Sequence, residues 1–458
     1  MPGKALEREI RRVGQALTEA FPPAYRHPLK ALDERAMELS AQDAELRAAL
    51  FRFVDVVPAC RSVDDLASHL IAFLGEVPDQ PPTVRAAMKM AHTKGGRAAL
   101  GAAGAAAVRH MAHRFIVGED PAAALPALRE LWRDGIAASV DLLGEATVTA
   151  AEADRYAARC AQALDTLSAA YERFDAQPLL EHDSLGVIPR ANLSVKVSAL
   201  TPLLRADAPQ RGQRDAAPRL RGLLRKAKQL GAHLHIDMES LDTREAVLEL
   251  VLDVLAEPEL TDGPSAGIVL QAYLRDSSET LDRVLAWAHR GEREHPLVVR
   301  LVKGAYWDHE IVEARRHGWS VPVFERKADS DRNFEQLTER LLRARPAVRV
   351  AIASHNLRSV AHAIALNRRL GGDERDIELQ VLRGLGDDLG HALAASGLRV
   401  RAYCPVGDLV AGMAYLVRRL LENTANESFL HEQAAGASLE QLLAPPGASA
   451  IDDGEGQP

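Results

Sequence analysis

Four polar side chains near the carboxyl end of the chain share the spacing of one helical face. Tyr415, Arg418, Arg419 and Glu422 follow one another at i, i+3, i+4 and i+7, and residues at this spacing lie on the same side of a helix. An arginine offers a planar fork of donors that grips a carboxylate with two parallel hydrogen bonds. The pattern predicts a clamp for a small amino or carboxylic acid. A surface stripe with a weak Arg418–Glu422 ion pair is the competing interpretation.

Further polar side chains recur at or near the ends of short, β-branched runs. They are Glu145, Lys196, Asp237, Gln271, Lys303, Tyr306, Trp307, Ser354, His355, Asn356, Gln380 and Tyr403. One polar residue in such a run is usually a satisfied core group. A succession of them favours a functional face, because in a parallel barrel the carboxyl ends of the strands meet at one rim.

Metal chemistry lacks its usual sequence signatures. His309 and Glu310 are followed by His317 rather than by a histidine one helical turn on, so the helical zinc pattern is absent. No C-x-x-C pair is present, so a zinc site built on cysteine pairs is not expected. We expect no metal site, and an organic cofactor becomes the natural source of difficult chemistry.

Composition narrows the class of protein. The chain has 458 residues, 47% of them hydrophobic and 26% charged, which is ordinary for a folded protein with a sizeable core. A net charge of −8 and only 4% aromatic residues argue against a nucleic-acid binder. Three widely separated cysteines and no signal-peptide pattern indicate a reducing, cytoplasmic compartment. The apolar run Ala98–Val108 is too short to span a bilayer and predicts a packed helix.

The secondary structure expected to position these groups changes along the chain, from helices alone to strands that alternate with helices. Up to about residue 130 the periodicity is helical, as in Ala31–Val54 and Val63–Glu76. Eight strand-like runs then alternate with helical stretches, at 137–143, 192–199, 233–238, 267–273, 297–303, 348–354, 377–382 and 398–403. Strands alternating with helices at this length predict a (β/α)8 barrel. An open doubly wound sheet should carry a Gly-rich fingerprint after an early strand, and none is present.

The predicted domain organisation follows from this change. We expect an amino-terminal helical arm over 1–45, a small all-α domain over 46–130, a distorted (β/α)8 barrel over 131–435, and a last helix and disordered tail over 436–458. The last helix is expected over Ser438–Leu443.

Several long strings of this sequence resemble one enzyme family. LSVKVSAL (193–200), HIDMES (235–240), RLVKGAYWDHEI (300–311), ASHN (353–356) and AYLVRRLLENTANESF (414–429) resemble proline dehydrogenase, a flavin enzyme that oxidises L-proline to Δ1-pyrroline-5-carboxylate. The helical segment with MAHRFIVGED (111–120) further resembles the bacterial bifunctional protein proline utilization A. That protein carries a second, aldehyde dehydrogenase half downstream. This chain is therefore expected to be a monofunctional relative or the separated dehydrogenase half.

The resemblance implies a substrate site on the barrel. Arg418 and Arg419 would hold the proline carboxylate with help from Lys196, and Glu145 would pair with one of the arginines as a gate. The residues expected to wall the proline ring or lie beside it are Asp237, Tyr306, Leu382, Tyr403 and Tyr415. Hydride transfer requires an unprotonated substrate nitrogen, and the cationic surround would lower its pKa. The same charges would orient the ring.

The resemblance also implies bound FAD and an exit for its electrons. Flavin contacts are expected from Gln271, Arg300, Val302, Lys303, Gly304, Ala305, Trp307, Lys327, Ser354, His355, Asn356, Gln380, Glu422, Ser428 and Phe429. Arg300 would stabilise the reduced anion, and an internal ion pair of the barrel is an equally weighted interpretation of this residue. The family passes electrons to a membrane quinone, which implies reversible, peripheral membrane contact.

Two other functions compete with this assignment. An aldolase-like barrel enzyme would use a Schiff-base lysine, for which Lys196 or Lys303 could serve. A non-enzymatic role would retain the barrel as a scaffold or as a DNA-binding regulator. The first fifty residues contain no strand and no basic cluster, so DNA binding is rejected.

Overall fold

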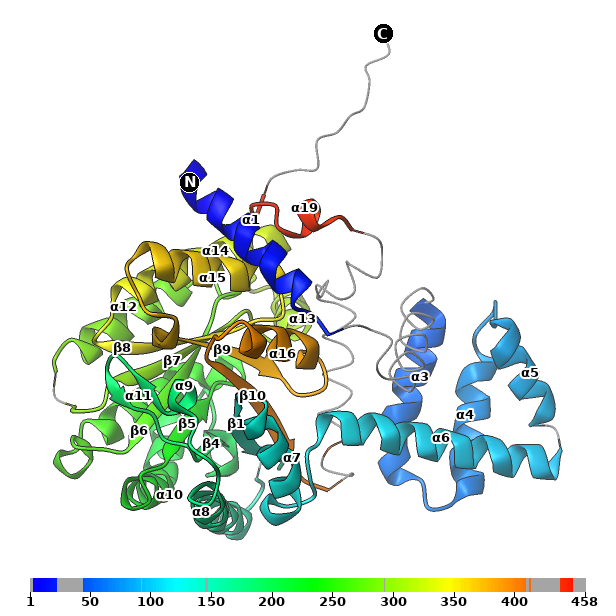
Figure 1. The fold of residues 1–458 in the computed structure, drawn as a ribbon. Coiled ribbons are helices and arrows are strands. Elements are labelled where there is room, and N and C mark those ends of the chain that lie inside the picture. Colours follow the sequence, from blue (N-terminus) through cyan, green and yellow to red (C-terminus); the bar gives the residue numbers. More distant parts are fainter. Residues whose placement is uncertain are drawn as a thin grey trace.

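The computed structural model describes residues 3–22, 44–91, 93–144, 147–291, 293–408, 412 and 437–447. Eight strands form a closed parallel barrel (Figure 1). They are β1 (Ile136–Leu142), β4 (Asn192–Lys196), β5 (His233–Asp237), β6 (Ser265–Gln271), β7 (Leu297–Val302), β8 (Val348–Ala353), β9 (Ile377–Leu382) and β10 (Val400–Val406). Their order is β1-β10-β9-β8-β7-β6-β5-β4, and β4 closes on β1 through Asp141 and Ser194. The predicted fold class is confirmed.

Helices cover the outside of the barrel. They are α8 (Ala150–Tyr171), α9 (Pro178–Glu181), α10 (Pro209–Gln229), α11 (Leu241–Leu255), α12 (Ser277–Ala288), α13 (Trp307–His317), α14 (Lys327–Arg343), α15 (Leu357–Arg369) and α16 (Asp387–Ala395). In α10, Leu220, Leu223, Leu224 and Ala227 are buried, which is the helical spacing of one apolar face. Helices cover the outside of the barrel and side chains fill its interior, so the strand residues are almost wholly buried.

Seven of the eight strands have bounds that differ from the sequence expectation by one to three residues, and two of these differences have a local cause. The strand expected over 192–199 ends at Lys196, and a 3-10 turn, Val197–Ala199, follows it. The last strand begins at Val400 rather than at Leu398, because the N–H of Leu398 still donates to the Leu393 carbonyl at the end of α16, at 3.1 Å. A short hairpin of β2 (His182–Asp183) and β3 (Gly186–Val187) was not expected from the sequence. It lies below the amino-terminal ends of the strands.

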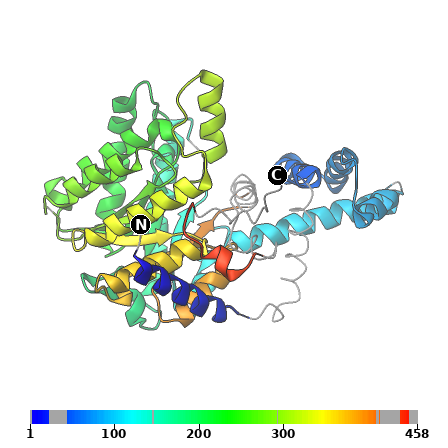
Figure 2. The same ribbon diagram turned by 90° about the horizontal axis from the view of Figure 1, so that it is seen from above.

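The segments near both termini pack on the barrel. Helix α1 (Lys4–Glu19) lies against α15, and α19 (Leu439–Leu442) lies beside α1 (Figures 1 and 2). Arg358 of α15 is buried and pairs with Glu7 of α1 at 2.6 Å and with Glu335 of α14 at 2.7 Å. The expected last helix is confirmed, with bounds one residue shorter at each end than 438–443.

A smaller group of helices stands to one side of the barrel. It comprises α3 (Ala44–Val56), α4 (Val63–Gly75), α5 (Pro82–Met90) and the long α6 (Lys94–Phe115), which extends away from the barrel in Figure 2. The expected helix over Ala98–Val108 lies inside α6 and packs on α4. Helix α7 (Pro121–Arg133) leads back into β1. The domain boundaries proposed from the sequence stay a prediction.

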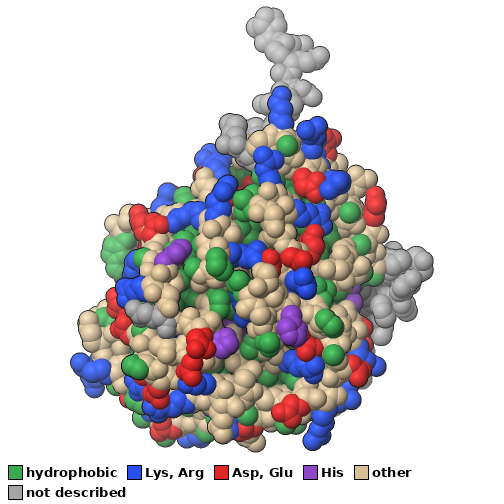
Figure 3. Space-filling view, turned by 60° about the vertical axis from the view of Figure 1, so that its left-hand side comes forward, with side chains coloured by type: hydrophobic (Ala, Val, Ile, Leu, Met, Phe, Trp, Pro, Cys, Tyr) green, Lys and Arg blue, Asp and Glu red, His purple; other side chains and the backbone are tan. Residues whose placement is uncertain are grey.

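Two surface properties bear on possible partners. Among the described residues, no helix is both long and apolar enough to cross a bilayer. On the face shown in Figure 3, basic and acidic side chains are interspersed rather than gathered by sign. Many of the surface charges form exposed ion pairs, such as Arg225–Glu259 at 2.6 Å, and such pairs contribute little to stability.

Candidate active site

Polar side chains from neighbouring strands meet at the carboxyl rim of the barrel, as the sequence predicts for a parallel barrel. Lys196 ends β4 and Asp237 ends β5, and the two residues are partners in the strand register. Tyr403 comes from β10, on the other side of β1. The barrel closure thus joins groups that are more than 160 positions apart, as in the Tyr403–Asp237 hydrogen bond.

Asp237 is the centre of this group. Its carboxylate accepts hydrogen bonds from Ser194 at 2.9 Å, from Arg300 at 2.9 Å and from the Tyr403 hydroxyl at 2.7 Å. The Lys196 ammonium lies 3.5 Å from its Oδ2 atom. A carboxylate with this many donors is held in one orientation and stays ionised. Asp237 thus contacts both Lys196 and Tyr403, and its expected place beside a proline site stays a prediction.

Asp141 is a member of the group that the sequence analysis missed. It lies in the apolar strand β1, is 1% exposed, and forms an ion pair with Lys196. Buried carboxylates are rare unless they are paired. An acidic residue inside the run SVDLL was therefore a usable signal, but the sequence alone did not say which face of the strand points inward.

Arg300 on β7 forms the internal ion pair that its alternative interpretation requires. Its guanidinium is buried and donates to Asp237, to Gln380 Oε1 at 2.7 Å and to the Ser194 and Ser139 hydroxyls. It also lies over the ring of Tyr403, with 5.3 Å between Cζ and the ring centroid. The proposed contact with a flavin stays a prediction.

Charge pairing sets the protonation of these groups. Burial disfavours the Lys196 ammonium, but Asp141 and Asp237 outweigh burial and raise the Lys196 pKa above its usual value. Burial would raise the Asp237 pKa, yet Lys196 and Arg300 hold it below its ordinary range. Burial, together with the two carboxylates, raises the pKa of Tyr403 well above 10. At neutral pH the rim therefore presents a charged lysine, a charged carboxylate and a neutral phenol.

The segment after β7 gathers several of the predicted cofactor residues. Lys303 pairs with Asp331 of α14, and Lys327 lies 3.9 Å from the same carboxylate. Trp307 begins α13 and donates from Nε1 to the Phe324 carbonyl at 2.8 Å. Burial lowers the pKa of Lys303. Lys327 begins α14, and a helix amino terminus also attracts negative charge, so this lysine suits an anionic group.

Glycine is required at position 304 in this segment. Gly304 has a φ of +138°, and a Cβ there would lie 2.2 Å from the ring of Tyr273. The turn thereby brings the flanking Lys303 and Ala305 close over the end of β6, where the Tyr273 N–H donates to the Lys303 carbonyl at 2.8 Å. Val302 accepts from the Ala272 N–H at 2.9 Å, and Tyr306 precedes α13.

The ends of β8 and β9 place the remaining described residues. His355 Nε2 accepts a hydrogen bond from the backbone N–H of Leu382 at 2.9 Å, so that nitrogen is unprotonated and the proton is on Nδ1. Asn356 caps α15 by accepting from the Ser359 N–H, and Ser354 accepts from the Asn356 N–H at 3.1 Å. Ser354, His355 and Asn356 thus lie at the end of β8, whereas Gln380 is buried inside β9 and contacts Arg300 and Glu378.

The substrate clamp cannot be placed. Glu145, Tyr415, Arg418, Arg419, Glu422, Ser428 and Phe429 lie outside the described residues.

The described residues contain one group of three potential metal ligands whose atoms lie within 4.8 Å of one another, on and beside α4. The group consists of Cys60, Asp65 and His69. Asp65 and His69 pair at 3.7 Å, and this group is not part of the barrel rim.

One buried acceptor at the rim fits a bound cofactor. Gln271 at the end of β6 is 4% exposed, and its Oε1 has no hydrogen-bond partner among the described residues. Its amide nitrogen donates to the Glu239 carbonyl at 3.3 Å. An unsatisfied buried acceptor is costly unless a ligand supplies the donor. The ring N–H of a bound flavin is one donor that would satisfy this oxygen.

Comparison with known proteins decides the family. A model described as proline dehydrogenase matches residues 124–432, and one described as the proline utilization A N-terminal domain matches residues 7–115. The chain belongs to the proline dehydrogenase family. The family expected from the motifs is thereby confirmed, including its likeness to the dehydrogenase half of proline utilization A.

The relatives include both long and short proteins. The bifunctional protein PutA of Salmonella typhimurium is 34% identical over 351 residues, which are 74% of this chain and 25% of that protein. Proline dehydrogenase of Deinococcus radiodurans is 29% identical over 321 residues, 70% of this chain and 89% of that protein. The chain spans about a quarter of the length of its bifunctional curated relatives.

Solved structures of relatives share this fold. Proline utilization A from Bdellovibrio bacteriovorus inactivated by N-propargylglycine superposes with a TM-score of 0.87 and 34% identity, over 96% of this chain and 44% of that one. A variant of Bradyrhizobium japonicum proline utilization A superposes with a TM-score of 0.74 and 31% identity, over 97% of this chain and 46% of that one.

Proposed function

We propose that this chain is an FAD-dependent enzyme that oxidises L-proline to Δ1-pyrroline-5-carboxylate, the first step of proline breakdown to glutamate. The observation that carries the proposal is the charged group around Asp237 at the rim of a barrel whose sequence matches the proline dehydrogenase family. When bound, FAD would accept the hydride from the substrate carbon next to nitrogen at flavin N5. Gln271, Lys303 and Lys327 are the described residues that we expect to hold it.

The described side chains supply the electrostatics of the reaction. Lys196 keeps its charge at neutral pH and is 20% exposed at the side chain, so it can attract a substrate carboxylate. Its positive charge favours the unprotonated form of the substrate nitrogen. Asp237 fixes Lys196 and the Tyr403 hydroxyl, which keeps the wall of the site rigid. The predicted clamp of Arg418 and Arg419 and the predicted gate Glu145 belong to the same proposal.

A relative supports a substrate with a carboxylate beside a secondary amine. N-propargylglycine inactivates the Bdellovibrio bacteriovorus protein, and this compound shares that arrangement with L-proline. The aldolase alternative is less favoured for Lys196, because Schiff-base formation needs a neutral amine and the pKa of Lys196 is raised. Lys303 has a lowered pKa but is paired with Asp331.

The family also supports two partners. We propose that electrons leave to a membrane quinone during reversible, peripheral contact from the cytoplasm. We propose further that an aldehyde dehydrogenase half, on a separate or a detached protein, oxidises the product. Nucleic acid is not a proposed partner.

A spectrum tests cofactor and substrate together. Purified protein is expected to be yellow, and anaerobic L-proline should bleach the flavin band, with reoxidation by a soluble ubiquinone analogue. L-alanine, which lacks the ring and the secondary amine, is the matched control. A colourless protein, or a flavin band that L-proline leaves unchanged, would contradict the proposal. Trapping of a carbonyl substrate by borohydride on Lys303 would favour the aldolase alternative instead.

A further inference from the structure

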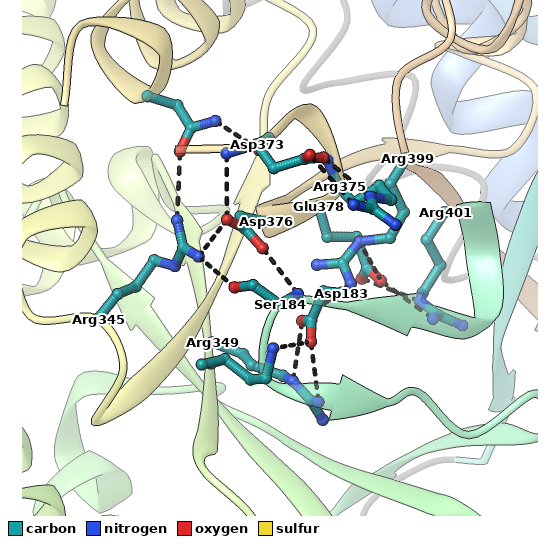
Figure 4. A network of polar contacts seen from close by, with 12 residues as sticks. Asp183, Ser184, Arg345, Arg349, Asp373, Arg375, Asp376, Glu378, Arg399 and Arg401 are labelled. Atoms are coloured by element: carbon teal, nitrogen blue, oxygen red, sulfur yellow. Dashed lines mark hydrogen bonds and ion pairs between the residues drawn. The ribbon is translucent and has the colours of Figure 1, made fainter. Parts of the chain in front are cut away.

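The opposite end of the barrel encloses a polar cavity. It lies at the amino-terminal ends of the strands, where Asn192 begins β4 and His233 begins β5, and its volume is about 20 Å³. That volume holds about one small molecule or ion. Charged side chains that line it include Arg349, Glu378 and Arg401, together with Arg399. We call these four residues and Asp183 of β2 the floor cluster, and Figure 4 shows them.

Two of the three arginines in the floor cluster each form a two-bond ion pair with one carboxylate. Arg401 donates from two nitrogens to Glu378, at 2.9 and 3.0 Å. Arg349 donates from two nitrogens to Asp183, at 3.0 and 3.1 Å. These are fork-to-fork pairs of the strong, planar kind. Glu378 is fully enclosed, and its two guanidinium neighbours hold its pKa well below the usual range despite burial.

Arg399 is the third arginine and has no carboxylate of its own. It is 3% exposed, and its Nη1 reaches Asp183 only as a third donor at 3.3 Å. Its Nε lies 4.0 Å from Glu378 and has no hydrogen-bond partner among the described residues. Arginine stays protonated in proteins, so the floor cluster holds three positive and two negative charges. A buried, unbalanced charge is costly.

The neighbouring histidines add no further charge to the floor cluster. His235 Nε2 must donate to the Ile268 carbonyl at 3.1 Å, because a carbonyl only accepts. His235 Nδ1 then accepts from His233 Nε2 at 3.1 Å, and His233 Nδ1 accepts from the Ser265 hydroxyl at 2.8 Å. Burial lowers the His233 pKa to about 3 and the His235 pKa well below its usual value, so both rings are neutral near pH 7, as this chain of hydrogen bonds assumes. Neither ring has an N–H left for a ligand.

The other charged residues near the cavity are already paired with opposite charges. Arg345 pairs with Asp376 at 2.5 Å and Arg375 with Asp373 at 3.0 Å, so both are neutral as pairs. Arg300 lies deeper in the barrel and pairs with Asp237. The single unmatched positive charge therefore belongs to Arg399, which borders the cavity.

We propose that the floor cavity binds one small monovalent inorganic anion, for which chloride is the abundant candidate, at the Nε of Arg399. The anion would balance the charge of the floor cluster and accept a hydrogen bond from Arg399 Nε, which has no partner among the described residues. A ligand that binds only the folded state raises stability with its concentration. The site is distinct from the proposed proline site, because Asn192, His233 and Ser265, which line it, begin their strands, and it approaches the rim cluster only through Gln380.

Thermal unfolding of the purified full chain tests the proposal. At constant ionic strength and constant sodium, replacement of gluconate by chloride should raise Tm in a saturable manner by about 2–4 °C, because gluconate is too large for the cavity. An equal Tm in both salts, or a rise that never saturates, would overturn the proposal.

A matched pair of variants and a crystal locate the effect. Arg399→Gln should lose the chloride dependence of Tm, whereas Arg375→Gln, which removes an exposed arginine beside the same cluster, should keep it. A bromide soak should give an anomalous peak next to Arg399 Nε in the parent protein. If Arg399→Gln does not fold, the bromide peak decides alone. A water in place of bromide, or chloride dependence retained in Arg399→Gln, would overturn the proposal.

Discussion

The two ends of the barrel use buried charge in different ways. The rim cluster consists of Lys196, Arg300, Asp141 and Asp237, and the floor cluster consists of Asp183, Arg349, Glu378, Arg399 and Arg401. The rim cluster is balanced, with two charges of each sign, and its lysine is partly exposed. The floor cluster is closed from solvent and carries one extra positive charge. We infer that the rim charges serve a ligand from solution, whereas the floor charges link β8 and β9 to the start of β10.

The largest expected effect is a loss of stability at the floor. Arg401→Met would leave Glu378 buried without its main partner, and breaking a buried ion pair by removing one partner costs about 3–5 kcal/mol. We expect the free energy of unfolding, measured by urea titration, to fall by that amount. The rate of flavin reduction per folded molecule should change little. Glu378→Gln added to Arg401→Met should restore part of the stability.

If Arg401→Met instead lowered the reduction rate without affecting the urea midpoint, the division of roles between the two ends would be wrong. A hydrogen-bonded route between them exists, because Gln380 donates to Glu378 at 2.6 Å and accepts from Arg300 at 2.7 Å. The measurement would then show that this route couples the floor to the rim.

The next effect is a loss of turnover at the rim. Lys196→Met removes the charge proposed to attract the substrate carboxylate and leaves Asp141 and Asp237 without it. We expect kcat/KM for L-proline to fall about 100-fold, the value of one strong charged contact. Lys226→Met, which removes a surface ion pair with Asp165, is the control and should leave kcat/KM within about twofold.

The sequence predicted the fold and much of the rim for a clear physical reason. Parallel strands end together, so polar residues at the ends of eight runs must share one edge, and Lys196, Asp237 and Tyr403 do so. Asp141 escaped notice because it lies inside its strand, where only the barrel register shows that it faces Lys196. Local pattern does not contain that register.

The floor cluster escaped notice for a related reason. Arg399 and Arg401 alternate with Val400, which is the pattern of an edge strand with a solvated face. Closure of the barrel buries both arginines instead. Asp183, the carboxylate that accepts from Arg399, is 216 residues away, on a two-residue strand that no periodicity could indicate. The predicted clamp on Arg418 and Arg419 lies outside the described residues and stays a prediction.

Lowering the pH is expected to have a smaller effect on the free energy of unfolding, through a carboxylate at the floor end of the barrel. Burial raises the pKa of Asp376, but hydrogen bonds from Ser184 and Arg345 outweigh it and lower the pKa to about 2. Its charge therefore stabilises the fold fully above the unfolded pKa of about 3.9, and the contribution is lost as the pH falls toward 2. Asp376→Asn should remove about 2 kcal/mol of the pH dependence of unfolding between about pH 4 and pH 2. An unchanged slope would show that Arg345 finds another acceptor.

The smallest expected effect has the opposite sign and lies at the rim. Glu239 follows β5, accepts a hydrogen bond from the Ser198 hydroxyl, and has a pKa raised by burial. A carboxyl with a raised pKa stabilises the fold below its unfolded pKa and loses that contribution as the pH rises through the folded value. At neutral pH Glu239→Gln should therefore raise the free energy of unfolding, by less than about 1 kcal/mol because the side chain is only half-buried. At about pH 4 the variant and the parent should unfold alike. Destabilisation at neutral pH would mean that the Ser198 hydrogen bond outweighs burial, and Glu239 would then resemble Glu378 at the floor, whose pKa is lowered by its arginine neighbours despite burial.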